Sequence, residues 1–185
     1  MSRVLVTGGN GFIGQHVVKA ALKRGHDVVS LVRKPTGDRS ESNDLVDRAA
    51  TVAEGDIRDL ISLQRAMSQC DAVIHTAALY SFKRSDAAPM YEVNVRGTEN
   101  VIRAAIKANV DRIVYTGTVG TTAFKEDDLA TEADVAEPSS MHGPYKRSKF
   151  EAERIVRRYA QQGIPIITVC PTAPIGPGDA KPTPT

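Results

Sequence analysis

The chain has 185 residues, of which 41% are hydrophobic and 25% are charged, and its formal net charge is +2. These values are typical of one ordinary globular domain. The small net charge argues against a nucleic-acid or membrane-surface partner, and no apolar stretch approaches the roughly 20 residues of a membrane span. We expect a cytoplasmic protein that acts on a small molecule, in which Cys70 and Cys170 are small buried hydrophobes rather than a disulfide or metal pair.

Strand and helix patterns alternate along the chain. The predicted elements are a strand over 4–7, a helix over 12–24, a strand over 27–33, a polar loop over 34–43, a short helix over 44–48, a strand over 51–54, a helix over 60–68 that begins at Asp59, a strand over 72–75, a long helix over 87–108, a strand over 112–116, a helix over 145–161 and a strand over 164–170.

The predicted strands are nearly continuous runs of Val, Ile and Leu, which is typical of strands covered on both faces. Together with the alternation, this predicts an α/β fold of the Rossmann type, with a doubly wound parallel sheet of strand order 3-2-1-4-5-6. A ligand is expected at the carboxyl ends of the strands, near the switch between the first and fourth. We expect residues 1–170 to form the nucleotide-binding domain. Residues 171–185, rich in Pro and Gly, are expected to be an exit segment toward a substrate domain that is largely missing.

The most informative motif is Gly8-x-x-Gly11-x-x-Gly14, which joins the first predicted strand to the first predicted helix. The first glycine allows a sharp turn, the second allows close approach of a pyrophosphate, and the third allows close packing of helix and sheet. The N–H groups at the helix N-terminus, which begins with Phe12 and Ile13, then favour phosphate. The motif predicts dinucleotide binding, and the alternative is a structural turn that happens to be rich in glycine.

A second motif is Tyr145-Lys146-Arg147-Ser148-Lys149, at the start of the last predicted helix. Tyr145 and Lys149 are four residues apart and share a helix face, with Cβ atoms roughly 5–6 Å apart. An ammonium beside a phenol favours the phenolate, so we expect the pKa of Tyr145 to fall from about 10 toward neutrality. Tyr145 is therefore a candidate general acid or base.

A hydroxyl-bearing segment, Thr116-Gly117-Thr118, ends the fifth predicted strand. Together with the glycine motif and the Tyr145/Lys149 pair, it resembles the extended short-chain dehydrogenase/reductase superfamily, which includes sugar-nucleotide epimerases, dehydratases and dihydroflavonol-reductase-like enzymes. Residues 142–153 and 171–185 resemble the hopanoid-associated sugar epimerase subgroup. The resemblance implies a catalytic triad of Thr118, Tyr145 and Lys149. Relatives usually carry a Ser-Ser pair where this chain has Gly117-Thr118, and Thr116 is the alternative hydroxyl.

The resemblance also implies the remaining contacts to a nicotinamide cofactor. The residues so assigned are the three glycines with Phe12 and Ile13, then Asp56 and Ile57 at the adenine, Thr76, Ala77 and Ala78 near the nicotinamide, Asn94, and finally Tyr145 and Lys149. Asn94 is expected to steady the fold around the site, which is compatible with a buried helix Asn bonded to backbone. We assign no acid–base chemistry to His75.

The end of the second predicted strand reads Leu31-Val32-Arg33-Lys34, with no acidic residue to take the ribose hydroxyls of NAD. Arg33 offers a bidentate fork for a 2′-phosphate. This favours NADP, with NAD still possible. The alternative is that Arg33 and Lys34 form a solvated strand end.

Two hypotheses for function remain open. The first is an NAD(P)-dependent reductase or sugar epimerase/dehydratase that transfers hydride to or from a carbonyl or carbinol of a sugar or flavonol-like molecule. The second is a dinucleotide-binding module without turnover, either a redox-sensing regulator or a fragment of a longer enzyme. The resemblance further implies a homodimer through two long helices, from Ala87 to Ala108 and from Tyr145 to Gln161. No metal is expected, since the acidic residues over 125–137 have no regular spacing and no His or Cys beside them.

Overall fold

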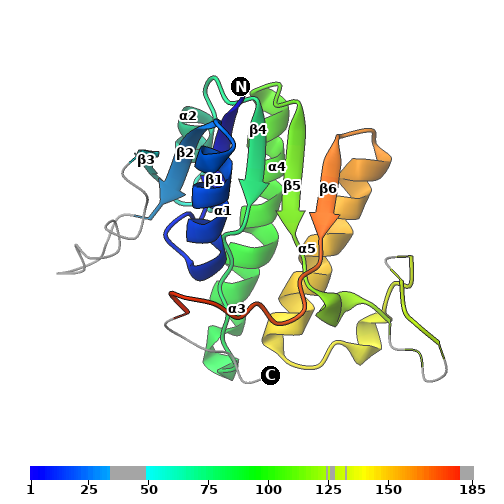
Figure 1. The fold of residues 1–185 in the computed structure, drawn as a ribbon. Helices are drawn as coiled ribbons and strands as arrows, with labels where there is room; N and C mark the ends of the chain where they lie inside the picture. The colour runs from blue at the N-terminus through cyan, green and yellow to red at the C-terminus, as the bar shows by residue number, and fades with distance from the viewer. Residues whose placement is uncertain (34–48, 124, 126–127, 132, 180–185) are drawn as a thin grey trace.

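The computed structural model describes residues 1–33, 49–123, 125, 128–131 and 133–179. Among these residues, six parallel strands form one sheet in the order β3-β2-β1-β4-β5-β6 (Figure 1). The predicted α/β fold and strand order are therefore confirmed. The strands are β1 (Arg3–Thr7), β2 (Asp27–Val32), β3 (Thr51–Glu54), β4 (Ala72–His75), β5 (Arg112–Thr116) and β6 (Ile166–Val169).

Helices pack on both faces of the sheet. The longer ones are α1 (Phe12–Lys23), α2 (Leu60–Ala66), α4 (Gly97–Lys107) and α5 (Pro144–Gln161). Val4 and Val6 of β1 pack with Val18 of α1 in one apolar cluster, whereas Leu5 packs with Val101 of α4 in another. Successive side chains of a strand point to opposite faces, so a strand buried on both reads as a continuous apolar run.

The expectation of burial on both faces is wrong for the two edge strands, since Val52 of β3 is 44% exposed and β6 is open as well. Ile167 and Val169 keep 45% and 50% of their surface exposed. β6 is the last strand of the described sheet and pairs only with β5. Its apolar run therefore reflects strand propensity and packing against α5, not enclosure between two helical layers.

The helix predicted over 87–108 is interrupted in its geometry. The chain runs from α3 (Ala87–Met90) through a π-helical segment, Tyr91–Arg96, into α4. The Thr98 hydroxyl donates to the Asn94 carbonyl at 2.6 Å, a bond that competes with the regular helical ladder. The spacing of apolar residues in the sequence predicts a helix here but does not distinguish a π-helical segment from an α-helix.

Most other boundaries agree with prediction within two residues. Asp59 begins α2 as expected, since its Oδ1 accepts from the Ile61 N–H at 2.9 Å. The loop and short helix predicted over 34–48 lie outside the described residues. Cys70 is buried, as predicted, whereas Cys170 is only partly buried, and within the described residues the two do not form a disulfide. Among the described helices, none is long and apolar enough to cross a membrane.

Candidate functional site

The sequence motifs meet at the carboxyl edge of the sheet. From β1 the chain adds β2 and β3 on one side of the sheet, and it then adds β4, β5 and β6 on the other side. The direction of winding therefore reverses between β1 and β4. The glycine turn follows β1, Thr76 follows β4, Thr118 follows β5, and α5 begins beside them. Open α/β sheets bind ligands at such switch points.

The glycine turn is built for close approach. Gly8 has φ +70°, and a Cβ placed on it would lie 2.9 Å from the Ala77 Cα. A Cβ on Gly14 would overlap the Gly8 carbonyl oxygen, so α1 can begin here only with glycine. Gly11 precedes α1, which has no side-chain cap and no acidic residue in its first turn. The turn thus fits a pyrophosphate, whose charge the helix N-terminus favours.

The predicted adenine end contains an ion pair that the sequence did not indicate. Arg58 donates to both carboxylate oxygens of Asp56, with Nη2 2.6 Å from Oδ2 and Nε 3.0 Å from Oδ1. The Arg58 side chain lowers the pKa of Asp56, and the charge of Arg33 at the end of β2 adds to this effect. The Asp56 carboxylate is therefore ionised and paired with Arg58. The neighbouring residue, Ile57, is buried against Gly97.

His75 is buried, and both of its ring nitrogens have hydrogen-bond partners. Its Nδ1 lies 2.7 Å from the Thr7 hydroxyl, and its Nε2 lies 3.0 Å from the Thr98 hydroxyl. Burial lowers the pKa of His75 to about 3, and the charge of Lys149 adds to the effect. The neutral ring thus links β1, β4 and α4. The next residue, Thr76, donates its hydroxyl to the Thr7 carbonyl at 2.7 Å and so orders the segment that contains Ala77 and Ala78.

Asn94 acts as a clamp inside the protein. Its Oδ1 accepts from the Leu79 N–H at 2.7 Å, and its Nδ2 donates to the Leu79 carbonyl and to the Ser148 Oγ, both at 2.9 Å. Asn94 is 1% exposed, and these bonds support the expected role of steadying the fold, here between the segment after β4 and α5. Its contact with a cofactor stays a prediction.

Lys149 is buried and held in place. Its Nζ donates to the Thr116 carbonyl at 2.8 Å and lies 4.6 Å from the centroid of the Tyr115 ring. Burial lowers the pKa of Lys149 to about 8, while the charge of Glu153 opposes that decrease. The Thr116 carbonyl is thereby occupied. The Thr118 Oγ1 accepts from the Gly120 N–H at 3.2 Å, which leaves its hydroxyl proton for a substrate oxygen.

Tyr145 differs from expectation. Its ring meets the Tyr80 ring edge to face at 4.5 Å, and burial followed by the charge of Tyr80 raises its pKa. The predicted lowering is wrong for the chain by itself, because Lys149 points to Thr116 and the loss of water around the phenol dominates. Tyr145 is thus protonated at neutral pH in the chain by itself.

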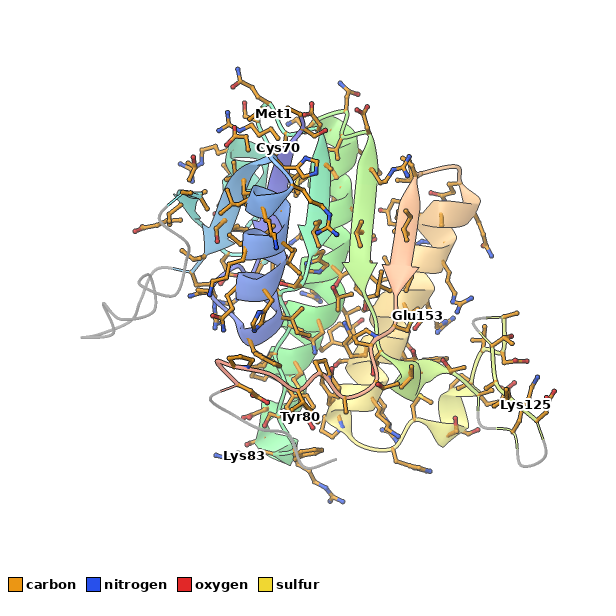
Figure 2. All side chains as sticks on the ribbon, in the orientation of Figure 1. Met1, Cys70, Tyr80, Lys83, Lys125 and Glu153 are labelled. Atoms are coloured by element: carbon orange, nitrogen blue, oxygen red, sulfur yellow. The ribbon has the colours of Figure 1, made fainter. Side chains whose placement is uncertain are left out.

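Three side chains at the site lack a motif in the sequence analysis: Tyr80, Tyr115 and Glu153 (Figure 2 labels Tyr80 and Glu153). Tyr80 packs on Tyr145, and Tyr115 lies under Lys149. Glu153 is 7% exposed and binds Arg157. The spacing of Lys149, Glu153 and Arg157 at intervals of four was the available signal for the last of these.

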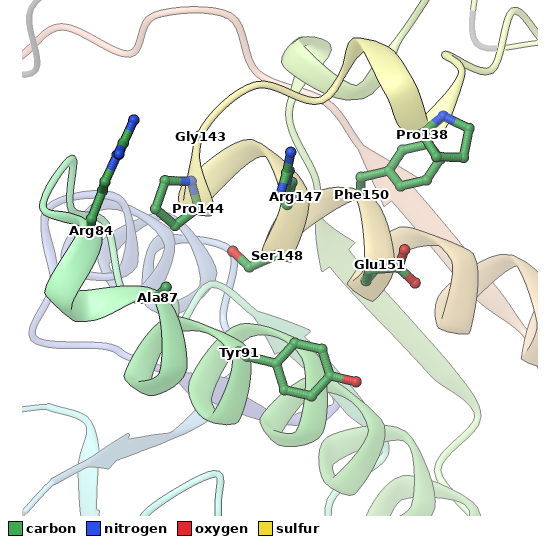
Figure 3. A pocket seen from close by; sticks show the side chains of 10 residues that line it. All are labelled: Arg84, Ala87, Tyr91, Pro138, Gly143, Pro144, Arg147, Ser148, Phe150 and Glu151. Carbon is green, nitrogen blue, oxygen red and sulfur yellow. The ribbon is translucent and has the colours of Figure 1, made fainter.

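Two cavities flank this region. One, of about 400 Å³, lies between α1 and residues 174–177, where the His16 Nε2–H donates to the Pro177 carbonyl at 2.9 Å. Figure 1 shows the segment after β6, in red, running back toward α1. The larger cavity, of about 670 Å³, lies on another side of α5 and is lined by Tyr91, Arg147 and Phe150 among others (Figure 3). Tyr145 and Lys149 do not line it.

A parallel sheet of this order, with a glycine turn at its switch point, defines a dinucleotide-binding protein of the Rossmann type. Comparison with known proteins narrows the class. The model of the NAD dependent epimerase/dehydratase family matches residues 4–185, and the chain belongs to this family. The resemblance to extended short-chain dehydrogenases/reductases is thereby confirmed.

The relatives include reductases and epimerases. A putative dihydroflavonol 4-reductase of Synechocystis sp. is 38% identical over 181 residues, which are 97% of this chain and 51% of that protein. The UDP-glucose 4-epimerase of Neisseria meningitidis serogroup C is 34% identical and covers 84% of this chain and 48% of its own length. The chain thus spans about half the length of the curated relatives it matches.

Solved structures agree with this grouping. The crystal structure of gox2253 superposes with a TM-score of 0.86 at 37% identity, over 100% of this chain and 55% of that one. The UDP-glucose 4-epimerase of Thermus thermophilus, in complex with NAD, superposes with a TM-score of 0.76 at 32% identity, over 91% of this chain and 54% of its own. The chain is therefore similar to the dinucleotide-binding part of an oxidoreductase or epimerase.

Proposed function

We propose that the protein is an NADP(H)-dependent reductase or epimerase that acts on a carbonyl or carbinol of a small molecule, such as a sugar or a flavonol-like compound. The observation that carries this is the Tyr145/Lys149 pair at the start of α5, on the same sheet edge as the glycine turn. The cofactor, when bound, supplies hydride chemistry. The residues of the chain bind, orient and protonate.

Each residue of the proposed triad has a distinct task. Tyr145, whose pKa is raised by burial, gives its proton to the substrate oxygen in the reductive direction. Thr118 donates its hydroxyl to the same oxygen and orients it. Lys149, held at the Thr116 carbonyl, places an ammonium where it can hydrogen-bond a ribose hydroxyl.

The preference for NADP rests on charge at the adenine end. Arg33 is exposed, and its charge acts on Asp56, whose carboxylate Arg58 already neutralises. A 2′-phosphate beside Arg33 would therefore meet a cation, and the nearby Asp56 carboxylate is already paired with Arg58. The NAD complexes among the structural neighbours make NAD the alternative.

The decisive test is a titration of the 185-residue chain with NADPH and with NADH, followed by nicotinamide fluorescence. We expect tighter binding of NADPH and a loss of about 10-fold or more in its affinity in Arg33→Ala, because one charge-assisted contact is removed. NADH binding should be unchanged in that variant. Tighter binding of NADH would overturn the NADP preference, and binding of neither would overturn the function.

A second candidate is a dinucleotide-binding module without turnover, supported by the glycine turn at the switch point of the sheet, which would bind a cofactor with or without turnover of a substrate. A panel of carbonyl substrates with NADPH separates the two. Turnover that is lost in Tyr145→Phe, with NADPH affinity retained, supports the enzyme. Binding without turnover in the wild type supports the module.

We also propose a homodimer through residues 87–108 and α5. These helices lie side by side, since Arg158 of α5 donates to Glu99 of α4 at 2.9 Å. Sedimentation equilibrium would test this, with a monomer at all concentrations as the refuting result.

A further inference from the structure

Glu153 is a buried carboxylate on the same face of α5 as Lys149, one turn further along the helix. Both of its oxygens are bound by other residues of the chain. Oε1 accepts from Arg157 Nη2 at 2.7 Å and Nε at 3.0 Å, and Oε2 accepts from the Thr121 hydroxyl at 2.5 Å. A buried carboxylate with charge-assisted bonds on both oxygens has one preferred position.

Through Thr121, Glu153 reaches the turn that contains Thr118. Thr121 ends the 3-10 turn Val119–Thr121, which Thr118 caps through its Oγ1. The Thr121 hydroxyl lies 2.8 Å from the Thr118 carbonyl as well as within reach of Glu153. The carboxylate therefore ties the Thr118 turn to α5.

The charge of Glu153 also reaches Lys149. It opposes the effect of burial and raises the pKa of that ammonium. Tyr115 interacts with both groups. Its ring centroid lies 4.6 Å from the Lys149 Nζ. Burial raises the pKa of its phenol most, and the charge of Glu153 is the next cause. The Glu153 carboxylate thus acts on the Thr118 turn through Thr121 and on Lys149 and Tyr115 through its charge.

We propose that Glu153 is a positioning residue that ties the Thr118 turn to α5 and places a negative charge one helical turn from the Lys149 ammonium, with the Tyr115 ring as the platform under Lys149. This rests on the proposed roles of Lys149 and Thr118. Glu153 itself touches neither substrate nor cofactor.

The other titratable groups around Lys149 leave Glu153 as its main anionic partner near neutral pH. His75 on β4 is neutral, because its pKa is about 3. Tyr115 on β5 and Tyr145 on α5 have raised pKa values and are protonated. Cys170, after β6, raises the pKa of Lys149 less than Glu153 does.

The test is the pKa of Lys149 itself, followed by NMR of its Cε and Nζ resonances over a pH series in the 185-residue chain. Glu153→Gln keeps the side-chain size and removes the charge, so it should lower the pKa of Lys149. Arg157→Gln should raise it, because the field of Glu153 is then less neutralised. Arg157 is 41% exposed and the Gln amide that replaces it can still donate to the Glu153 carboxylate, so this variant is expected to fold even if Glu153→Gln does not.

The matched control is Glu151→Gln, two residues away on α5, whose carboxylate pairs with Arg154 at 3.1 Å. It should leave the pKa of Lys149 unchanged. A Lys149 pKa that is the same in Glu153→Gln as in wild type, or that shifts equally in Glu151→Gln, would overturn the proposal, as would a decrease in Arg157→Gln. The readout needs no cofactor, so failure of NADPH binding would count against the proposed function and not against this role.

Discussion

Asn94 offers a sharp test of how the site is held together. Its side chain makes three hydrogen bonds, to the Leu79 N–H, the Leu79 carbonyl and the Ser148 hydroxyl, and it is 1% exposed. Asn94→Ala removes all three and leaves the Leu79 backbone groups without these partners. At about 1 kcal/mol for each bond, the free energy of unfolding should fall by about 3 kcal/mol.

The matched control is Asn100→Ala on the neighbouring helix α4. Asn100 donates only from Nδ2, to the Ile57 and Arg58 carbonyls at 3.2 and 3.1 Å, and it is half-buried. Two bonds at the same value would give about 2 kcal/mol, but water replaces them in part at this half-buried position, so the free energy of unfolding should fall by only about 1 kcal/mol. Urea unfolding of both variants, with equal m-values, gives the comparison. If Asn94→Ala loses no more stability than Asn100→Ala, the clamp is not a major source of stability and the reasoning is refuted.

Three further outcomes are expected. The pKa of His75 is about 3 in the folded chain and about 6.5 in the unfolded chain, so the folded state loses stability as the pH falls through that range. In urea unfolding between about pH 6 and 4, the free energy of unfolding of the wild type should fall by about 1.4 kcal/mol per pH unit more than that of His75→Gln. Parallel profiles for the two proteins would contradict this. Gly14→Ala places a Cβ against the Gly8 carbonyl oxygen and should abolish NADPH binding in the fluorescence titration. Gly25→Ala strains a residue with φ +78° but meets nothing within 4 Å, so it should lower stability and retain binding; equal affinities would refute the cradle. Tyr80→Ala exposes the Tyr145 phenol and should lower its pKa in an ultraviolet pH titration, and an unchanged value would show that Tyr80 is not a cause.

Local sequence determined the framework of this protein. The turn formed by Gly8, Gly11 and Gly14 needs glycine, because a Cβ at the first or third position would overlap backbone atoms. Apolar runs marked the strands, and the alternation with helices predicted the sheet order, because right-handed crossovers leave few arrangements. The four-residue interval placed Tyr145 and Lys149 on one helix near the site.

Tertiary structure decided what those side chains do. The pKa of Tyr145 depends on burial and on Tyr80, which is 65 residues away in the sequence, so the helix spacing alone predicted the wrong direction. Asp56 meets Arg58, and Lys149 meets the Thr116 carbonyl and the Tyr115 ring, through backbone turns and strand register that periodicity does not encode. Charge and proton affinity are properties of the assembled surroundings, because desolvation and neighbouring charges act through space rather than along the chain.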